Sequence, residues 1–170
     1  MNLVRFASYM SLAVCALCVA PAGAQTAEEF RSLKDRAEIE ELVVRYATAL
    51  DTLDADAYTN VFTEDAVFDV TGTVYRGRAA IRGIVTGLQE GRDRSLSEGT
   101  PPVSLYHVMS NTSIEIIDED EARHTSYAQT VRLADDGQFV VGFMGRYEDV
   151  IVKRDGRWQI QSRRLVSFLE

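Results

Sequence analysis

Four long segments near the C-terminus have the alternation of β-strands, and three short polar turns separate them. The segments cover residues 105–117, 122–133, 138–153 and 157–169. The turns are Asp118-Glu119-Asp120, Asp135-Asp136-Gly137 and Arg154-Asp155-Gly156. Such Asp- and Gly-rich turns between strand-like runs are typical of β-hairpins. The sequence therefore predicts an antiparallel meander.

Helical periodicity dominates the chain before these strands. Apolar residues recur at 3.6-residue spacing over one stretch: Ala37, Ile39, Leu42, Val43, Tyr46, Ala47 and Leu50. Asp54 is placed to cap a short helix over residues 55–61, and we expect a strand over 66–71 and a third helix over 77–87. Residues 89–102 are polar and predict a loop. Helices first and a meander after them predict an α+β domain, in which helices cover one face of a curved sheet.

The first 24 residues have the composition of a secretory signal peptide. Arg5 gives a positive start, residues 6–20 are apolar, and Ala22-Gly23-Ala24 provides an A-x-A cleavage motif. We therefore expect an exported protein, periplasmic or secreted, whose mature domain covers residues 25–170. A retained membrane anchor is the alternative, although the apolar run is shorter than the roughly 20 residues that a span needs.

Composition excludes several kinds of site. Both cysteines, Cys15 and Cys18, lie in the leader, so the mature chain is predicted to have neither disulfides nor thiolate chemistry. A net charge of −8 argues against nucleic acid or an anionic membrane as a partner. The predicted hairpin sets His107 and His124 roughly 23 Å apart at about 3.3 Å per residue, so they cannot share a metal ion. We expect no metal and no cofactor, and we expect His124 at the surface beside Arg123.

Three residues are candidates for acid–base chemistry. Asp51 falls at a helix C-terminus, where the helix dipole disfavours a carboxylate, so it is either functional or a solvated turn residue. His107 lies within an apolar strand, where it is either a proton-transfer group or a core histidine with backbone partners. Tyr46 lies on the apolar stripe of the first helix, where it either packs or aims its hydroxyl into a pocket.

The pattern I39-x-x-L42-x-x-R45-Y46-x-x-A49-L50-D51-x-x-D54, followed by F62-x-x-D65-A66, resembles the opening of SnoaL-like domains. These belong to the nuclear-transport-factor-2-like superfamily. H107-x-x-x-N111, G145-R146-Y147-x-D149 and D155-G156-x-W158 are similar to that family's later strands. The resemblance covers nearly all of residues 36–166. It implies a cone-shaped domain with one internal pocket.

Within that superfamily the order of Tyr46, Asp51 and His107 resembles the catalytic residues of bile-acid 7α-dehydratase. Scytalone dehydratase is similar in its linker aspartate and strand histidine, and its second catalytic histidine falls at about Arg132. The resemblance implies dehydration, or the related proton transfer of an isomerase, on a hydroxylated carbonyl compound of steroid- or polyketide-like character. A ligand-binding protein without turnover is the alternative.

The expected ligand is a small apolar molecule, and the predicted wall of its pocket follows from strand alternation and the resemblance. Alternation places Phe139, Val141, Phe143 and Tyr147 on one strand face. The expected ligand-contacting residues are Tyr58, Phe68, Val70, Met109, Arg132, Phe143 and Tyr147. A homodimer or homotrimer is expected through the outer sheet surface, where polar residues give way to Val150 and Val152.

Overall fold

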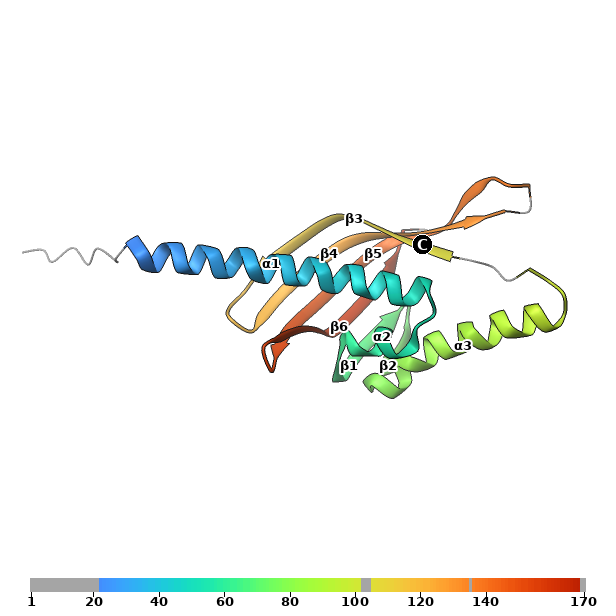
Figure 1. The fold of residues 1–170 in the computed structure, drawn as a ribbon, viewed down its shortest axis with the longest axis horizontal. Coiled ribbons are helices and arrows are strands. Elements are labelled where there is room, and N and C mark those ends of the chain that lie inside the picture. Colours follow the sequence, from blue (N-terminus) through green and yellow to red (C-terminus); the bar gives the residue numbers. More distant parts are fainter. Residues whose placement is uncertain (1–21, 102–104, 135, 169–170) are drawn as a thin grey trace, which may run out of the picture.

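A computed structural model describes residues 22–101, 105–134 and 136–168. Most of the predicted signal peptide therefore lies outside the described residues. The helices are α1 (Ala22–Asp51), α2 (Ala55–Asn60) and α3 (Gly77–Ser97). The strands are β1 (Phe62–Val70), β2 (Thr73–Arg76), β3 (Leu105–Ile116), β4 (Glu121–Leu133), β5 (Phe139–Arg154) and β6 (Arg157–Ser167). This is the predicted α+β architecture (Figure 1).

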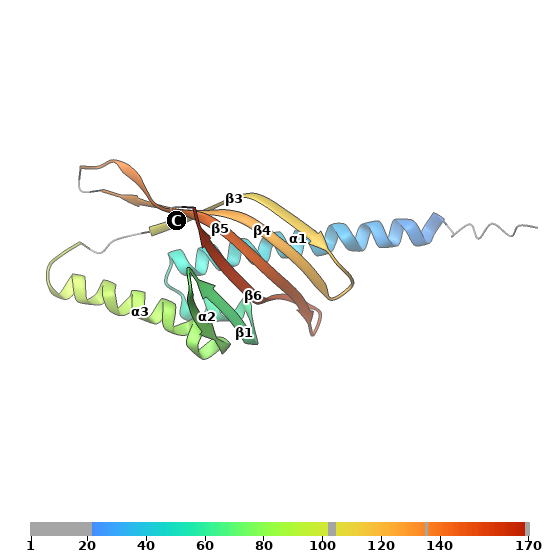
Figure 2. The same ribbon diagram turned by 180° about the vertical axis from the view of Figure 1, so that it is seen from behind.

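The six strands form one curved sheet in the order β2-β1-β6-β5-β4-β3. β1 and β6 pair in parallel, and every other neighbouring pair is antiparallel. Figure 2 shows the sheet from behind, with α1 crossing its far face. The predicted meander is confirmed as β3 to β6, whereas β1 starts earlier than expected and β2 was not predicted.

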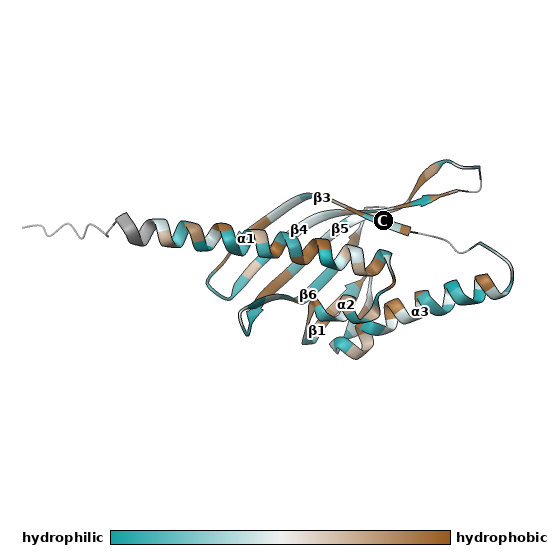
Figure 3. Cartoon of the chain, viewed as in Figure 1, coloured by the Kyte–Doolittle hydropathy of each residue, from teal (hydrophilic) through white to brown (hydrophobic). Residues whose placement is uncertain are grey.

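The long helix α1 lies on the inner face of the sheet because its apolar stripe matches that surface. Ile39, Leu42 and Tyr46 are each no more than 1% exposed. Figure 3 shows hydrophobic residues alternating with polar ones along α1, as expected for a helix with one face on a core. Asp54 caps α2 as predicted, because its carboxylate accepts the N–H groups of Asp56 and Ala57.

The expected loop over residues 89–102 is wrong for most of its length, because α3 continues to Ser97. The segment after Gly87 contains Leu, Gln, Glu and Arg, all good helix formers, and one interior glycine costs only about 1 kcal/mol. Gly99, with a φ of 70°, and Pro101 lie just beyond its end. Within the described residues no helix is both long and apolar enough to cross a membrane.

A bulge in β5 overturns the expected alternation. Phe143 pairs with Thr130 and Val141 pairs with Val131, so Gly142 is an extra residue between them. Adjacent residues on β4 point to opposite faces, and one extra residue reverses the side-chain direction. Phe143 and Tyr147 therefore face α1, whereas Phe139 and Val141 lie on the outer face.

Aromatic side chains fill the space between α1 and the middle of the sheet. The rings of Tyr46, Tyr58 and Phe62 are within 5.2–6.0 Å of one another by centroid distance, and Phe68 and Tyr147 extend the cluster. All five residues are at most 3% exposed. The centre of the domain is therefore an aromatic core, and the cavities described below lie beside α1.

Candidate active site

Asp51 and His107 form a close pair where the C-terminus of α1 meets β3. The Nδ1 atom of His107 lies 2.6 Å from Oδ1 of Asp51. The backbone N–H of His107 donates to both carboxylate oxygens of Asp51, at 3.0 and 3.2 Å. These bonds compensate the helix dipole, which disfavours a carboxylate at this position. The two residues selected from the sequence are thus brought together by the fold.

The carboxylate determines how the imidazole is oriented. An ionised carboxylate only accepts hydrogen bonds, so an ionised Asp51 requires Nδ1 of His107 to carry the hydrogen, and in the neutral ring Nε2 is then a lone-pair acceptor. The side chains of His107 and Asp51 remain 13% and 20% exposed, respectively. An Asp–His pair of this kind can take up and return a proton at Nε2.

A cavity of about 440 Å³ lies beside this pair. The end of α1, the middle of α3 and the start of β3 enclose it, and twelve of the described residues line it. The apolar and small ones are Leu50, Leu53, Gly87, Leu88, Gly91 and Leu105. The polar ones are Asp51, Thr52, Arg92, Ser95, Tyr106 and His107. An apolar wall with a few polar groups at one end is typical of small-molecule sites.

Tyr46, the third residue selected from the sequence, does not line this cavity. It is 1% exposed, and its hydroxyl lies 3.1 Å from the hydroxyl of Tyr147 inside the aromatic core. Five residues along a helix rotate a side chain by about 140°, so Tyr46 and Asp51 project in different directions. The expectation that Tyr46 shares a cavity with His107 is corrected.

The expected ligand wall is likewise elsewhere, since none of its seven residues lines the cavity beside His107. Tyr58, Phe68 and Tyr147 are core residues, and Val70 and Met109 pack against that core. The remaining two residues, Phe143 and Arg132, lie near the Asp51–His107 pair according to the strand pairing. Phe143 is in the cross-strand row of His107 and Thr130, and Arg132 is opposite Leu105.

The second histidine, His124, is buried. The expectation that it lies at the surface is wrong. His124 is 1% exposed, and its Nδ1 lies 2.6 Å from Oδ2 of Asp149. Arg163 donates to the same carboxylate through Nε at 2.8 Å and Nη2 at 2.7 Å. Its Cζ also lies 3.9 Å from the ring centroid of Tyr46 and 4.3 Å from that of Tyr147.

Electrostatics keep the buried Asp149–Arg163 pair ionised. Burial works to raise the pKa of Asp149, but the guanidinium of Arg163 outweighs it and holds the pKa below its usual range. Burial works to lower the pKa of Arg163, and Asp149 reverses that effect and raises it. Burial raises the pKa of Tyr147 well above its usual range. The charge of Arg163 is thus balanced deep inside the aromatic core.

Sequence reasoning missed this cluster because its members are far apart in the chain. His124, Asp149 and Arg163 occupy one cross-strand row over β4, β5 and β6. Aligning β4 with β5 and β5 with β6 in the sequence would have shown that the three residues share a row. Ser126 is on the same face of β4 as His124, but its hydroxyl has no hydrogen-bond partner among the described residues. Ser126, His124 and Asp149 therefore do not form a nucleophilic triad.

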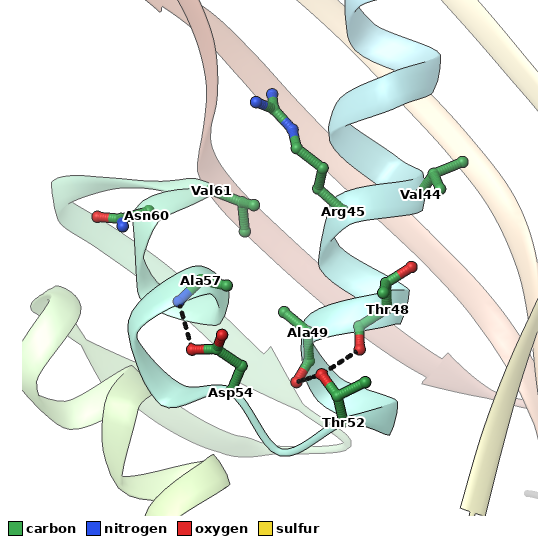
Figure 4. A pocket seen from close by; sticks show the side chains of 9 residues that line it. All are labelled: Val44, Arg45, Thr48, Ala49, Thr52, Asp54, Ala57, Asn60 and Val61. Atoms are coloured by element: carbon green, nitrogen blue, oxygen red, sulfur yellow. Dashed lines mark hydrogen bonds between the residues drawn. The ribbon is translucent and has the colours of Figure 1, made fainter.

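A second cavity, of about 350 Å³, lies between α1 and α2 (Figure 4). Arg45 and Asp54 lie on opposite sides of it, and Thr48, Ala57 and Val61 also line it. It contains neither histidine nor tyrosine, so it offers no proton-transfer group near neutral pH. No cluster of three potential metal ligands occurs within the described residues. The Asp51–His107 cavity is thus the better candidate for chemistry.

Comparison with known proteins agrees with this architecture. The sequence profile of the SnoaL-like domain matches residues 31–164. An uncharacterised protein of Mycobacterium tuberculosis is 30% identical over 132 residues, which are 77% of this chain and 84% of that protein.

Two solved structures from Novosphingobium aromaticivorans are similar in fold. One is a nuclear-transport-factor-2-like protein with a cystatin-like fold. Its TM-score is 0.72 at 23% identity, over 85% of this chain and 89% of that one. The other is described as a candidate scytalone dehydratase, with a TM-score of 0.67 at 22% identity over 82% and 87% of the two chains. The chain belongs to the SnoaL-like family and has its nuclear-transport-factor-2-like fold.

Proposed function

We propose that this protein is an exported, cofactor-independent enzyme that removes water from a small apolar substrate. The substrate class is a hydroxylated carbonyl compound of steroid- or polyketide-like character. The observation that carries the proposal is the 2.6 Å contact between Asp51 and His107 at the wall of an apolar cavity. The family supplies the class of chemistry, because its members include dehydratases and isomerases.

In the proposed reaction His107 acts first as the base. Its Nε2 takes the proton from the carbon next to the carbonyl, and the C–H electron pair becomes the enolate. Asp51 stabilises the resulting imidazolium through Nδ1. The enolate electrons then form the new double bond as the β-carbon–oxygen bond breaks. The proton returns from Nε2 to the departing oxygen, so the products are water and the conjugated carbonyl compound.

The developing enolate needs hydrogen-bond donors, and the cavity wall supplies them. Arg92 and Ser95 line the cavity with His107. Donors aimed at a developing oxyanion are often the largest single contribution to such catalysis. In this proposal they replace the hydroxyl of Tyr46, which is bonded to Tyr147 in the core. Tyr46 instead packs in the aromatic core.

The test uses a β-hydroxy naphthyl ketone, because loss of water creates a conjugated enone with a new ultraviolet absorption. We expect His107→Gln and Asp51→Asn to lower the rate by roughly 10²–10⁴-fold, the usual contribution of general acid–base catalysis. Asp54→Asn is the matched control, since it changes a carboxylate three residues away and asparagine caps helices as well as aspartate. A rate that is equal in wild type and His107→Gln would refute the proposal.

Isomerisation is a related outcome of the same geometry. If Nε2 returned its proton to a different carbon of the enolate, the double bond would move and no water would leave. A β,γ-unsaturated ketone as the probe distinguishes the two reactions. Conversion to the conjugated ketone that requires His107, without dehydration of the hydroxy ketone, would assign the protein as an isomerase.

A non-catalytic ligand-binding protein is the second candidate. The placement of Tyr46 outside the cavity favours it, because the third residue expected in an acid–base set is not at the site. Ligand binding is measured separately from turnover with 2-naphthol as the probe. Quenching of its fluorescence reports its binding to the cavity. Saturable binding that is lost in Leu53→Glu, together with no turnover of either ketone, would support the binding protein.

Export is part of the proposal and has its own test. The apolar leader and the A-x-A motif at Ala22-Gly23-Ala24 favour cleavage before Gln25. The intact mass of protein recovered from the exported fraction should correspond to residues 25–170. A mass that includes residues 1–24, or an added lipid, would contradict this.

A further inference from the structure

We propose that Arg132 binds a carboxylate on the substrate, so that the ligand of the Asp51–His107 cavity is an apolar molecule with one acidic group. The inference rests on the proposed function in one respect, because it takes the cavity beside His107 to be the ligand site. Three observations carry it. They are the place of Arg132 on the sheet, the lack of a partner for its charge, and the apolar surface around it.

Strand pairing places Arg132 on the cavity side of the sheet. Arg132 on β4 is directly opposite Leu105 on β3, and Thr130 is directly opposite His107. Side chains that are directly opposite one another in an antiparallel pair share a face. Leu105 and His107 both line the cavity. Arg132 therefore projects from the same face as His107, one strand further from the edge of the sheet.

The distance from Arg132 to the catalytic base sets where the acidic group lies in the substrate. Arg132 is two residues from Thr130, so it is the diagonal neighbour of His107. Diagonal neighbours are roughly 7–8 Å apart, which is within reach of long side chains. A carboxylate bound by Arg132 is therefore several bonds away from the carbon that gives its proton to Nε2 of His107. Arg92 and Ser95, on the α3 wall, remain available for the enolate oxygen.

The charge of Arg132 has no counter-charge in the folded chain. The side chain is half-buried, yet it makes no hydrogen bond or ion pair with any of the described residues. Arginine is seldom withdrawn from water unless it is paired. Four other arginines of the sheet each lie against a carboxylate: Arg123, Arg146, Arg163 and Arg164. A half-buried cation without a partner is a site that an anionic ligand can complete.

The described residues next to Arg132 on the cavity side are apolar or neutral. Leu105 and Val140 flank Arg132 in its own cross-strand row, and Phe143 lies beyond Thr130 in the next row. Apolar neighbours lower the local dielectric constant around the guanidinium. Its attraction for an anion is therefore stronger than it would be in open water.

A carboxylate suits this position better than a phosphate ester does. The guanidinium offers two parallel N–H donors, which match the two oxygens of a carboxylate. Asp51 lines the same cavity, and the chain has a net charge of −8. A phosphate monoester has nearly two negative charges at neutral pH, so it meets almost twice the repulsion that a carboxylate meets. The acidic group is therefore a carboxylate.

The binding test compares two fluorescent probes with the same ring system, 2-naphthol and 6-hydroxy-2-naphthoate, which differ by one carboxylate. We expect the naphthoate to bind the wild type about tenfold more tightly than 2-naphthol, the ratio typical of one charge-assisted hydrogen-bonded contact. In Arg132→Gln, which keeps a polar side chain and removes the charge, this ratio should fall to about one. Circular dichroism checks that the variant is folded.

Arg94→Gln is the matched control. Arg94 is exposed on α3 and does not line the cavity, and its substitution removes the same charge from the chain. We expect this variant to keep the wild-type preference for the naphthoate. An equal loss of preference in Arg94→Gln and Arg132→Gln would mean that the overall charge, and not Arg132, attracts the acid. That result would overturn the proposal.

The remaining outcomes separate this proposal from the proposed reaction. Equal affinity of the wild type for both probes, or a preference that survives in Arg132→Gln, would overturn the carboxylate site and leave the dehydration test unaffected. Tighter binding of 2-naphthyl phosphate than of the naphthoate would overturn the choice of a carboxylate. Naphthoate binding that depends on Arg132, with no dehydration of the hydroxy ketone, would support the carboxylate site and refute the reaction alone. No saturable binding of either probe would overturn the ligand site itself.

Discussion

The carboxylate of Asp51 holds His107 in two ways, at the imidazole Nδ1 at 2.6 Å and at the backbone N–H at 3.0 and 3.2 Å. One side chain at the end of α1 thus orients the ring and also satisfies an edge-strand donor of β3. This links the geometry of the site to the docking of α1 on the sheet. Catalysis and stability should therefore respond differently when the two partners are removed.

His107→Ala removes the ring but keeps the backbone N–H bond to Asp51, whereas Asp51→Ala removes both. We expect Asp51→Ala to lower the free energy of unfolding by about 1 kcal/mol more than His107→Ala, because it also leaves a strand donor without its partner. Urea denaturation of the two variants measures the difference. Equal losses of stability would mean that the backbone bond contributes nothing.

Asp149→Asn should be far more damaging, because Arg163 is fully buried and would lose its counter-charge. Removing one partner of a buried ion pair typically costs about 3–5 kcal/mol. Asp35→Asn is the control: Asp35 also binds a cation, but its partner Lys153 keeps 21% of its side chain exposed and can turn towards water. Thermal unfolding should rank the variants in that order, and the reverse ranking would contradict the role of Asp149.

The same two carboxylates predict how stability depends on pH. Arg163 holds the pKa of Asp149 low, and hydrogen bonds from Lys153 and Trp158 outweigh burial to lower that of Asp35. A lowered folded pKa adds stability above the unfolded value of about 3.9, and this stability is lost as pH falls through the folded value. Acid titration of Asp149→Asn should therefore show a weaker loss of stability below about pH 4 than the wild type does.

Tyr58 and Tyr46 offer a matched pair of hydroxyl deletions in the aromatic core. The Tyr58 hydroxyl is buried without a hydrogen-bond partner among the described residues, whereas that of Tyr46 lies 3.1 Å from the Tyr147 hydroxyl. We expect Tyr58→Phe to be neutral or stabilising and Tyr46→Phe to cost about 0.5–1.5 kcal/mol. Chemical denaturation tests this, and a destabilised Tyr58→Phe would contradict the lack of a hydrogen-bond partner for that hydroxyl.

Gly145 and Gly83 should respond oppositely to alanine. A Cβ at Gly145 would clash with the carbonyl oxygen of Val166 and lie 2.7 Å from the Phe143 ring, so the strand must shift. A Cβ at Gly83, on the exposed side of α3, meets nothing within 4 Å, and the change should stabilise the helix by about 0.5–1 kcal/mol. Melting temperatures that fall for Gly145→Ala and rise for Gly83→Ala would agree with these contacts.

Local sequence patterns determined the elements and their order. The 3.6-residue stripe ending at Leu50 fixes the buried face of α1, and the Asp54 carboxylate fixes the start of α2. Polar turns fix the hairpins closely near the turn, where Ile114 pairs with His124. Asp51 and His107 could be selected from the sequence because one is a carboxylate at a helix C-terminus and the other is a histidine within an apolar strand. These features depend on interactions within a few residues, which a sequence displays directly.

Tertiary structure alone decided which side chains meet. Bulges near Asn111 and at Gly142 each add one residue to a strand. The first sets His107 opposite Thr130, and the second reverses the face of Phe139 and Val141. The side-chain period of a strand is two, so one extra residue reverses every direction beyond it. The meeting of Asp149 with His124 and Arg163 depends on two strand registers at once, β4 with β5 and β5 with β6. Local sequence patterns do not contain the combined register of strands that are far apart in the chain. Only the folded sheet determines it.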